Sequence, residues 1–485
     1  MILKENKIKF IAAYTVAALL FGCSCMKEAN KAKDEVKDIA LGQEINRSLP
    51  PLETIKGASL EQMVDFAMKA RPEIKAAELA VKDARLALKQ LAADAPIFQN
   101  TNNIFTSFSV DFGLGHSESS KGVHGIDNLE GETHGNASSD ISISLLLWDF
   151  GRNNAAVAAQ IERVIAAENS LLEVKYSAFE DVATSYFNML EKRALMQVAL
   201  TNAHEFAVHL EHAEKRLEAG EIKNLDILRA RLDLAVAKEA LINASNNVRV
   251  TSASMLSALG LESSKYSFDE IFNTQKDFLS EMTRCLPDST ETLDEIFSFA
   301  RTNAPAISVK RARLRAALSD VDAAKAEMLP KISASASLNW ADPLWFWKWG
   351  VNGAWNLFNG FRMKNALKRS VVAMQTIAAD VEDTELKLSV SLELALSRRD
   401  NALEARSSAN ESLQRASENM RYVGAMFNVG EASRVDFTSA VSDYIEALGS
   451  RVTAFYEGQR AEAALFALAG RYPRYDEKKI KENDL

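Results

Sequence analysis

Two long stretches without proline constrain the fold of this chain more than any other feature. No proline lies between Pro96 and Pro287, or between Pro343 and Pro473. Within these stretches, residues 152–218 and 361–428 are rich in Ala, Leu, Glu, Lys and Arg, which favour helix, and Gly424 is their only glycine. Since a helix rises about 1.5 Å per residue, we predict two helices of roughly 100 Å each.

The two stretches belong to two copies of one plan, because four landmarks recur at an offset of 210 residues. They are Trp148 to Arg152 with Phe358 to Arg362, Gly220-Glu221 with Gly430-Glu431, Leu225-Asp226 with Val435-Asp436, and Leu259-Gly260 with Ala469-Gly470. Upstream, Pro72 and Pro96 correspond to Pro305 and Pro330 at a larger offset. The extra residues of the first half lie around 115–137, and their Gly, Ser, His and Asn content predicts an exposed loop.

Between the helices lie four stretches in which apolar and polar side chains alternate. They cover about residues 104–114, 139–149, 331–341 and 346–357. Alternation over about ten residues, bounded by turn residues, is typical of membrane strands with lipid on one face and water on the other. An ordinary half-buried sheet would show the same pattern, so alternation alone leaves both interpretations open.

The placement of tryptophan favours the membrane interpretation. Five of the six tryptophans lie within 16 residues: Trp340, Trp345, Trp347, Trp349 and Trp355. Because tryptophan is enriched at the level of lipid headgroups, we predict that these five form part of an interfacial girdle. Four strands leave two open edges, and lipid offers no partner for backbone groups. Copies must therefore join, either two with eight strands or three with twelve.

The first 22 residues are predicted to be an export signal. Three lysines precede an apolar stretch, Phe10 to Phe21, that is too short to span a bilayer comfortably. The stretch ends in Leu20-Phe21-Gly22-Cys23, which resembles a lipobox, so we expect Cys23 to be acylated. Acyl chains would anchor it firmly, since each buried CH₂ contributes ~0.8 kcal/mol. The alternative is a plain signal peptide with an incidental cysteine.

Glycine is predicted to end each long helix. The turns at 218–221 and 428–431 lead into return helices of about 35 to 40 residues, with Gly220 and Gly430 as C-terminal caps. In the first return helix, the small and apolar residues step by three and four, the spacing of a packed helix seam. This predicted seam consists of Leu225, Leu228, Leu232 and Ala235.

Together these features resemble the TolC-like outer membrane efflux proteins. The resemblance rests on the duplicated plan, the Pro-x-Ile helix starts at Pro72 and Pro305, and the turn contexts Gly220 to Asp226 and Gly430 to Asp436. It covers about residues 59–470. With its lipobox, the chain is similar to the lipoprotein branch that serves resistance-nodulation-division (RND) pumps.

The resemblance implies a mainly helical TolC-like fold with two repeats. Three copies would form a twelve-stranded barrel and a long helical periplasmic barrel, which act as a passive conduit for export. A periplasmic adaptor (membrane fusion protein) and an inner-membrane pump of the RND type are the expected partners, with the adaptor touching the turns at Gly220, Glu221, Gly430 and Glu431. The domain order is then signal peptide 1–22, anchored linker 23–58, first repeat 59–260, equatorial segment 261–291, second repeat 292–470 and tail 471–485.

Asp436 stands where members of this family carry an acidic residue near the closed periplasmic end. Ser439 and Ala432 stand where some members carry a second aspartate and an arginine. Three copies of Asp436 around one axis would favour cations and raise one another's pKa. An ordinary aspartate at a helix start, favoured by the helix dipole, is the alternative.

Enzymatic and nucleic-acid functions lack support in the sequence. The net charge of -9 opposes nucleic acid, and no phosphate loop, nucleophile elbow or CxxC pair occurs. Cys25 and Cys285 are too few for a disulfide framework. We therefore expect no catalysis, no metal, and no cofactor besides the lipid on Cys23.

The histidines invite a metal interpretation, which we weigh against a simpler one. His204, His209 and His212 lie on the first long helix beside Glu205 and Glu211, but the same helix lacks any other ligand cluster, so we expect solvated helix histidines. The other three, His116, His124 and His134, fall in the expected loop. The alternative function for the whole chain is a lipid-anchored coiled-coil scaffold or adaptor without a pore, which explains the helices but not the amphipathic strands.

Overall fold

The computed structural model describes residues 29, 31, 33, 59–93, 107–118, 133–220, 222–262, 265–266, 292–341, 344–429 and 431–471. Glu53–Leu485 forms one unit of the chain. Cys23, the rest of the predicted signal, and most of the predicted equatorial segment lie outside the described residues.

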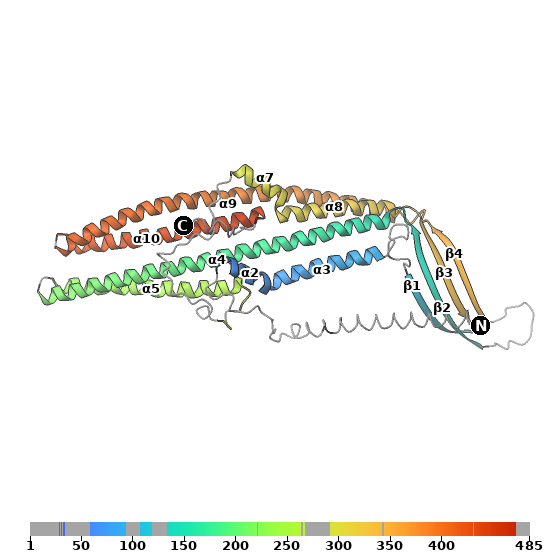
Figure 1. Cartoon of the computed structure of the whole chain (residues 1–485), viewed down its shortest axis with the longest axis horizontal. Helices are drawn as coiled ribbons and strands as arrows, with labels where there is room; N and C mark the ends of the chain where they lie inside the picture. The colour runs from blue at the N-terminus through green and yellow to red at the C-terminus, as the bar shows by residue number, and fades with distance from the viewer. Residues whose placement is uncertain are drawn as a thin grey trace, which may run out of the picture. The chain divides into compact units, whose positions relative to one another are not determined.

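Each half contains two short helices, two strands and two long helices (Figure 1). The first half consists of α2 (Leu60–Ala70), α3 (Pro72–Ala93), β1 (Ser107–Glu118), β2 (Thr133–Trp148), α4 (Arg152–Glu218) and α5 (Asn224–Ala258). The second consists of α7 (Leu293–Asn303), α8 (Pro305–Ala326), β3 (Lys331–Ala341), β4 (Leu344–Ala354), α9 (Arg362–Asn428) and α10 (Arg434–Ala469). Since α4 and α9 are both 67 residues long, the predicted pair of long helices and the duplication are confirmed.

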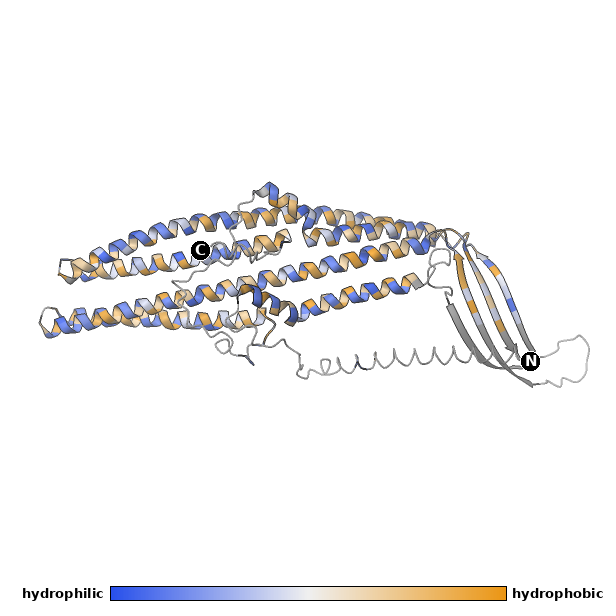
Figure 2. Cartoon of the chain, viewed as in Figure 1, coloured by the Kyte–Doolittle hydropathy of each residue, from blue (hydrophilic) through white to orange (hydrophobic). Residues whose placement is uncertain are grey.

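The long helices pack as two antiparallel hairpins. α4 packs against α5 and α9 against α10, while α4 also contacts α3, α8 and α10. Apolar and polar residues alternate along all of these helices (Figure 2). Among the described residues, no helix combines the length and the apolar character that a bilayer crossing requires.

The four strands form one antiparallel sheet in the order β1-β2-β3-β4. β1 and β2 are longer toward each other than the predicted 104–114 and 139–149, because Glu118 pairs with Thr133 and His116 with Gly135. Part of the expected loop is therefore strand, and His116 and His134 are strand residues, whereas His124 lies outside the described residues. β3 matches 331–341, and β4 lies two to three residues earlier than the predicted 346–357.

The strand-to-helix junctions explain the first landmark of the repeat. The Asp149 carboxylate, 3% exposed, accepts from the backbone N–H of Gly151 (3.1 Å) and of Asn153 (2.8 Å), and so caps α4. In the second half, the Asn359 side chain accepts from the N–H of Met363 at 3.3 Å. Both junctions turn through left-handed backbone, with φ of 86° at Gly151 and 64° at Phe361.

We expect Asp149→Ala to destabilise the protein by about 1 to 2 kcal/mol, the usual loss for a helix cap. Asn359→Ala removes one longer hydrogen bond and serves as the matched variant, with a smaller expected loss. Denaturant unfolding of the detergent-purified protein, followed by circular dichroism, measures both. Equal losses for the two variants would show that the buried carboxylate is not the stronger cap.

The last landmark, Leu259-Gly260 and Ala469-Gly470, meets the break between the two short helices of its own half. A Cβ on Gly470, whose φ is 70°, would lie 3.0 Å from the Asn303 carbonyl oxygen and 3.0 Å from Pro305 Cδ. A Cβ on Gly260, with φ of 79°, would lie 3.3 Å from the Ala70 carbonyl oxygen. Glycine is required at both positions because the backbones approach so closely. In each half, the glycine landmark at the end of the repeat thus contacts the helix break beside the proline landmark at its start.

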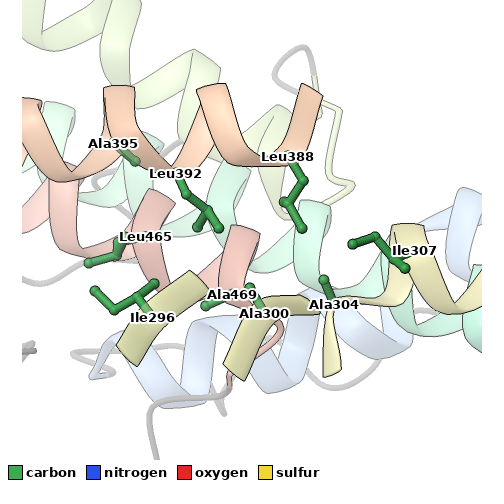
Figure 3. Packing of buried hydrophobic residues seen from close by; sticks show 9 residues of the cluster. All are labelled: Ile296, Ala300, Ala304, Ile307, Leu388, Leu392, Ala395, Leu465 and Ala469. Carbon is green, nitrogen blue, oxygen red and sulfur yellow. The ribbon is translucent and has the colours of Figure 1, made fainter. Parts of the chain in front are cut away.

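A buried apolar cluster surrounds this contact in the second half (Figure 3). It joins Ile296, Ala300, Ala304 and Ile307 at α7 and α8 to Leu388, Leu392 and Ala395 of α9 and to Leu465 and Ala469 of α10. The alanines let the helices approach closely, and Leu392 is fully buried. The cluster therefore holds the return helix against the start of its own repeat.

Candidate functional site

The sheet has one apolar and one polar face, and the strand register shows it directly. One row across β2, β3 and β4 pairs Ile143 with Ala336 and Ala336 with Trp349. The adjacent row, one residue along, pairs Ser142 with Ser337 and Ser337 with Lys348. Because neighbouring residues of a strand point to opposite faces, an apolar surface backs onto a serine-rich one.

The predicted girdle tryptophans belong to the inner strand β3, to the edge strand β4 and to the segment just beyond β4. Trp347 and Trp349 of edge strand β4 are both 71% exposed, and Trp355 is 59% exposed. The Trp355 indole N–H donates to the Met328 carbonyl at 3.1 Å, which ties the end of β4 to the end of α8. The backbones of Trp340 and Trp345 pair with each other, but their side chains lie outside the described residues.

At the other end of the long helices, each hairpin turns over a few residues. Gly220 lies two residues after the end of α4 and has a φ of 78°, as its predicted capping role requires. In the second turn the exposed Glu431 donates its backbone N–H to the Met426 carbonyl at 2.9 Å. Glu221 and Gly430 lie outside the described residues.

Asp436 closes the N-terminus of α10. Its carboxylate accepts from the backbone N–H (3.1 Å) and the hydroxyl (2.7 Å) of Ser433, and its own N–H donates to that hydroxyl at 3.2 Å. These hydrogen bonds hold the pKa of Asp436 below its ordinary value. Asp226 occupies the same place in α5, where it accepts from the backbone N–H of Lys223 at 3.3 Å. Within one copy, Asp436 and Asp226 therefore both act as helix-start aspartates, which is the alternative role considered for Asp436.

The predicted seam on α5 is not the face that packs within the chain. Leu225, Leu228 and Leu232 are 54%, 62% and 62% exposed. The opposite face is buried instead, with Ile227, Ala230 and Ala237 each at most 5% exposed against α4. The helix thus has two apolar faces, and one of them lacks a partner helix within the described residues.

Two contacts hold the α4–α5 hairpin to the α9–α10 hairpin near their turns. The Arg434 guanidinium of α10 forms an ion pair with Asp233 of α5 at 2.6 Å. The His209 ring of α4 stacks on Phe427 of α9 and Phe437 of α10, with ring centroids 5.5 and 5.2 Å apart. His209 is 7% exposed, so the expectation of a solvated histidine is wrong here.

The other two helix histidines, His204 and His212, are exposed as expected. Among the described residues, no three His, Cys, Asp or Glu side chains gather where they could hold a metal ion. The sequence interpretation missed the stacking because helical periodicity does not show which partner covers a face. One sequence feature does indicate an aromatic cluster here: Phe427 and Phe437 stand ten residues apart, on either side of the second turn.

A buried polar network joins the two halves further from the turns. The Arg460 guanidinium of α10 donates to Glu191 (2.6 Å) and Asn188 (2.8 Å) of α4 and to Glu457 (2.5 Å) of its own helix. The Glu191 side chain is only 4% exposed, and Lys192 contacts its other oxygen at 2.6 Å. The carboxylate is therefore fully compensated in spite of its burial.

Comparison with known proteins gives one family and several solved folds. The family model described as outer membrane efflux protein matches residues 64–261 and 297–471. No curated protein sequence gives a significant match. Crystal structures of CusC, which concern its folding and transmembrane channel formation, superpose with a TM-score of 0.71 at 18% identity, over 88% of this chain and 96% of CusC.

Two further structures agree with this fold. The CmeC outer membrane channel of Campylobacter jejuni gives a TM-score of 0.71 at 14% identity, over 91% of this chain and 93% of CmeC. The open state of the MtrE outer membrane channel of Neisseria gonorrhoeae gives 0.68 at 15% identity, over 88% of this chain and 94% of MtrE. At such low identities these likenesses show a common fold.

Proposed function

The chain belongs to the outer membrane efflux protein family, and from this premise we propose that three copies of it form one export conduit. Proteins of this family are trimeric channels of efflux systems, located in the outer membrane with a large periplasmic helical tunnel, and they work with adaptors and inner-membrane pumps. The chain is thus an outer-membrane efflux channel component. The alternative of a poreless scaffold does not agree with this membership.

The main support for a trimer of this chain is its four-stranded sheet, whose two edges are unpaired among the described strands. β1 and β4 stand at the two ends of the strand order, so each presents an outer edge of backbone N–H and C=O groups. In lipid such groups must be satisfied by another strand. Three copies joined edge to edge would give twelve strands in one closed sheet, with the apolar face toward lipid and the serine-rich face toward water.

The unpartnered face of α5 supports the same assembly. Its stripe of Leu225, Leu228, Leu232 and Val236, each more than half exposed, has the spacing of a helix seam. An exposed apolar stripe that follows one face of a helix is suited to packing against a helix of a second copy. We therefore assign the three leucines of the predicted seam, together with Val236, to a contact between copies rather than within one.

The test is the mass and conductance of the detergent-purified protein after reconstitution in planar bilayers. We expect a trimer that conducts ions, and a monomer or dimer that stays silent would remove the proposal. Leu228→Glu combined with Leu232→Glu is expected to shift part of the protein from trimer to monomer, because charge is placed in an apolar contact. Lys238→Glu, on an exposed position away from the stripe, is the matched control and should leave the mass unchanged.

The finer assignments are part of the same proposal. We assign lipid acylation to Cys23, contact with a periplasmic adaptor to the turns at Gly220, Glu221, Gly430 and Glu431, and an RND-type pump as energy source. The lipid is the only covalent group proposed, and the role is transport without catalysis. Metabolic labelling with palmitate, lost in Cys23→Ser, tests the anchor, and labelling that persists in this variant would contradict it.

Asp436 is proposed as an acidic ring at the entrance, and Asp226 offers a matched control because both residues cap a return helix. We expect Asp436→Ala to lower cation selectivity in planar-bilayer recordings, whereas Asp226→Ala should lose only a similar helix cap. Reversal potentials in a salt gradient measure the selectivity. If both variants keep the original selectivity, Asp436 is a helix cap and nothing more.

A further inference from the structure

The stack of His209, Phe427 and Phe437 lies where the two hairpins of one copy approach near their turns. The Phe427 and Phe437 rings are 4.8 Å apart and nearly parallel, at 18°, and His209 lies against both at 29° and 15°. Phe437 and its neighbour Val441 also pack on Ala203 and Phe206 of α4. The three ring centroids thus form a triangle, in which the histidine of the first hairpin lies against the stacked aromatic pair of the second.

The first hairpin has no such arrangement at the equivalent positions. At the repeat offset of 210 residues, Phe427 corresponds to Leu217 and Phe437 to Ile227. Ile227 is buried, and Leu217 packs beside it in an aliphatic cluster with Ala213. The aromatic pair is therefore special to the second turn, where its flat rings offer a surface on which an imidazole stacks.

One ring nitrogen of the imidazole can accept a proton but makes no hydrogen bond to any described residue. His209 Nδ1 is buried without a hydrogen-bond partner. The charged groups that face it are Arg434 of α10, Asp233 of α5, and His212 and Arg216 of α4, while α9 contributes Phe427. Burial is the largest cause that lowers the pKa of His209, Arg434 adds to it, and Asp233 opposes it.

We propose that His209 is a protonation-sensitive link between the two helical hairpins of each copy. When the imidazole is neutral, its stacking on Phe427 and Phe437 holds the hairpins together beside their turns. When a proton from the surrounding water binds, the buried ring becomes a cation against apolar rings and beside Arg434 and Arg216, and the hairpins separate there. A mildly acidic periplasm would then loosen the helical end of the protein.

The direction of the pH dependence follows from the pKa of the linked and released states. A released, solvated histidine has its ordinary pKa of about 6.5 and binds a proton more readily than the buried one. The linked state therefore has its full stability above about pH 6.5 and loses it as the pH falls toward the lowered pKa of the buried ring. The cation–π attraction of an imidazolium to the phenylalanines offsets part of this loss.

Amide hydrogen exchange of the full, detergent-purified protein tests the link without relying on conduction. Exchange is compared at about pH 7.5 and about pH 5.5, with labelling times scaled for the intrinsic chemistry, over residues 203–213 and 434–441. We expect faster exchange of both segments at the lower pH. The increase is at most roughly tenfold, because pH 5.5 lies one unit below the ordinary histidine pKa of about 6.5.

Four variants separate the link from a general effect of acid. His209→Phe should exchange slowly at both pH values. Because the larger phenylalanine ring can be poorly accommodated, His209→Gln is the second variant, and it should also lose the pH response. Phe437→Leu should exchange fast at both. His204→Phe, five residues away, exposed and not among the charged groups that face His209, should respond to acid as the unmodified protein does. An unmodified protein without acid-dependent exchange, or a response that persists in both His209 variants, would overturn the proposal. A missing trimer or a silent pore would bear on the proposed function alone.

Discussion

Arg460→Met is expected to lower the free energy of unfolding by about 3 to 5 kcal/mol, the cost of leaving a buried charge without its partner. Arg460 donates to Glu191 at 2.6 Å, and the Glu191 side chain is 4% exposed. Without the guanidinium, the Glu191 carboxylate retains its ion pair with Lys192, whose side chain is 34% exposed. The loss is measured by the denaturant midpoint of the detergent-purified protein.

The matched control is the double variant Glu191→Met with Arg460→Met. It removes both charges and fills the space with flexible apolar side chains, so most of the lost stability should return. A double variant that is as unstable as Arg460→Met would show that the remaining partners of the network, Asn188 and Glu457, carry the stability instead. A single variant with unchanged stability would mean that water replaces the guanidinium.

The second large effect is expected at Gly470. Alanine there would combine the left-handed backbone, with φ of 70°, and a Cβ 3.0 Å from both the Asn303 oxygen and Pro305 Cδ. The backbone contributes about 1 to 2 kcal/mol and the crowding about 1 to 3 kcal/mol, so Gly470→Ala should destabilise by about 2 to 5 kcal/mol. Thermal unfolding followed by circular dichroism measures the loss.

Gly220 separates the two causes. It has a similar φ of 78°, but no atom lies within 4 Å of the position of its Cβ. Gly220→Ala should therefore show only the backbone cost of about 1 to 2 kcal/mol. If the two variants lose the same stability, the close approach at Gly470 relaxes without cost and the packing argument is wrong.

Local patterns in the sequence were sufficient for much of the fold. Helix propensity and the lack of proline predicted α4 and α9 almost to the residue, because every turn of a long helix repeats the same local signal. Alternation with period two located the four strands. It failed between residues 115 and 137, where polar, glycine-containing segments are held in strands by each other, through pairs such as Gly115 with Asn136.

What the sequence could not show is which face of a helix meets a partner. On α5 both the Leu228 face and the Ile227 face are apolar, and only the fold shows that the second is buried within the chain. His209 gave the same difficulty, since a histidine on a long helix rich in charged residues is typical of a solvated surface, whereas Phe427 and Phe437 come from more than 200 residues away. Contacts between distant segments are decided by packing, not by local composition.

The contact between Gly470 and the helix break at Pro305 also bears on how the chain arose. Each half attaches its last helix to its own first helices, through Gly260 to Ala70 and through Gly470 to Asn303. A polypeptide of half this length would already possess that closure and one pair of strands. Six copies of such an ancestor would present as many strands as three copies of the present chain, so gene duplication and fusion would have preserved the ring while halving the number of subunits to be assembled.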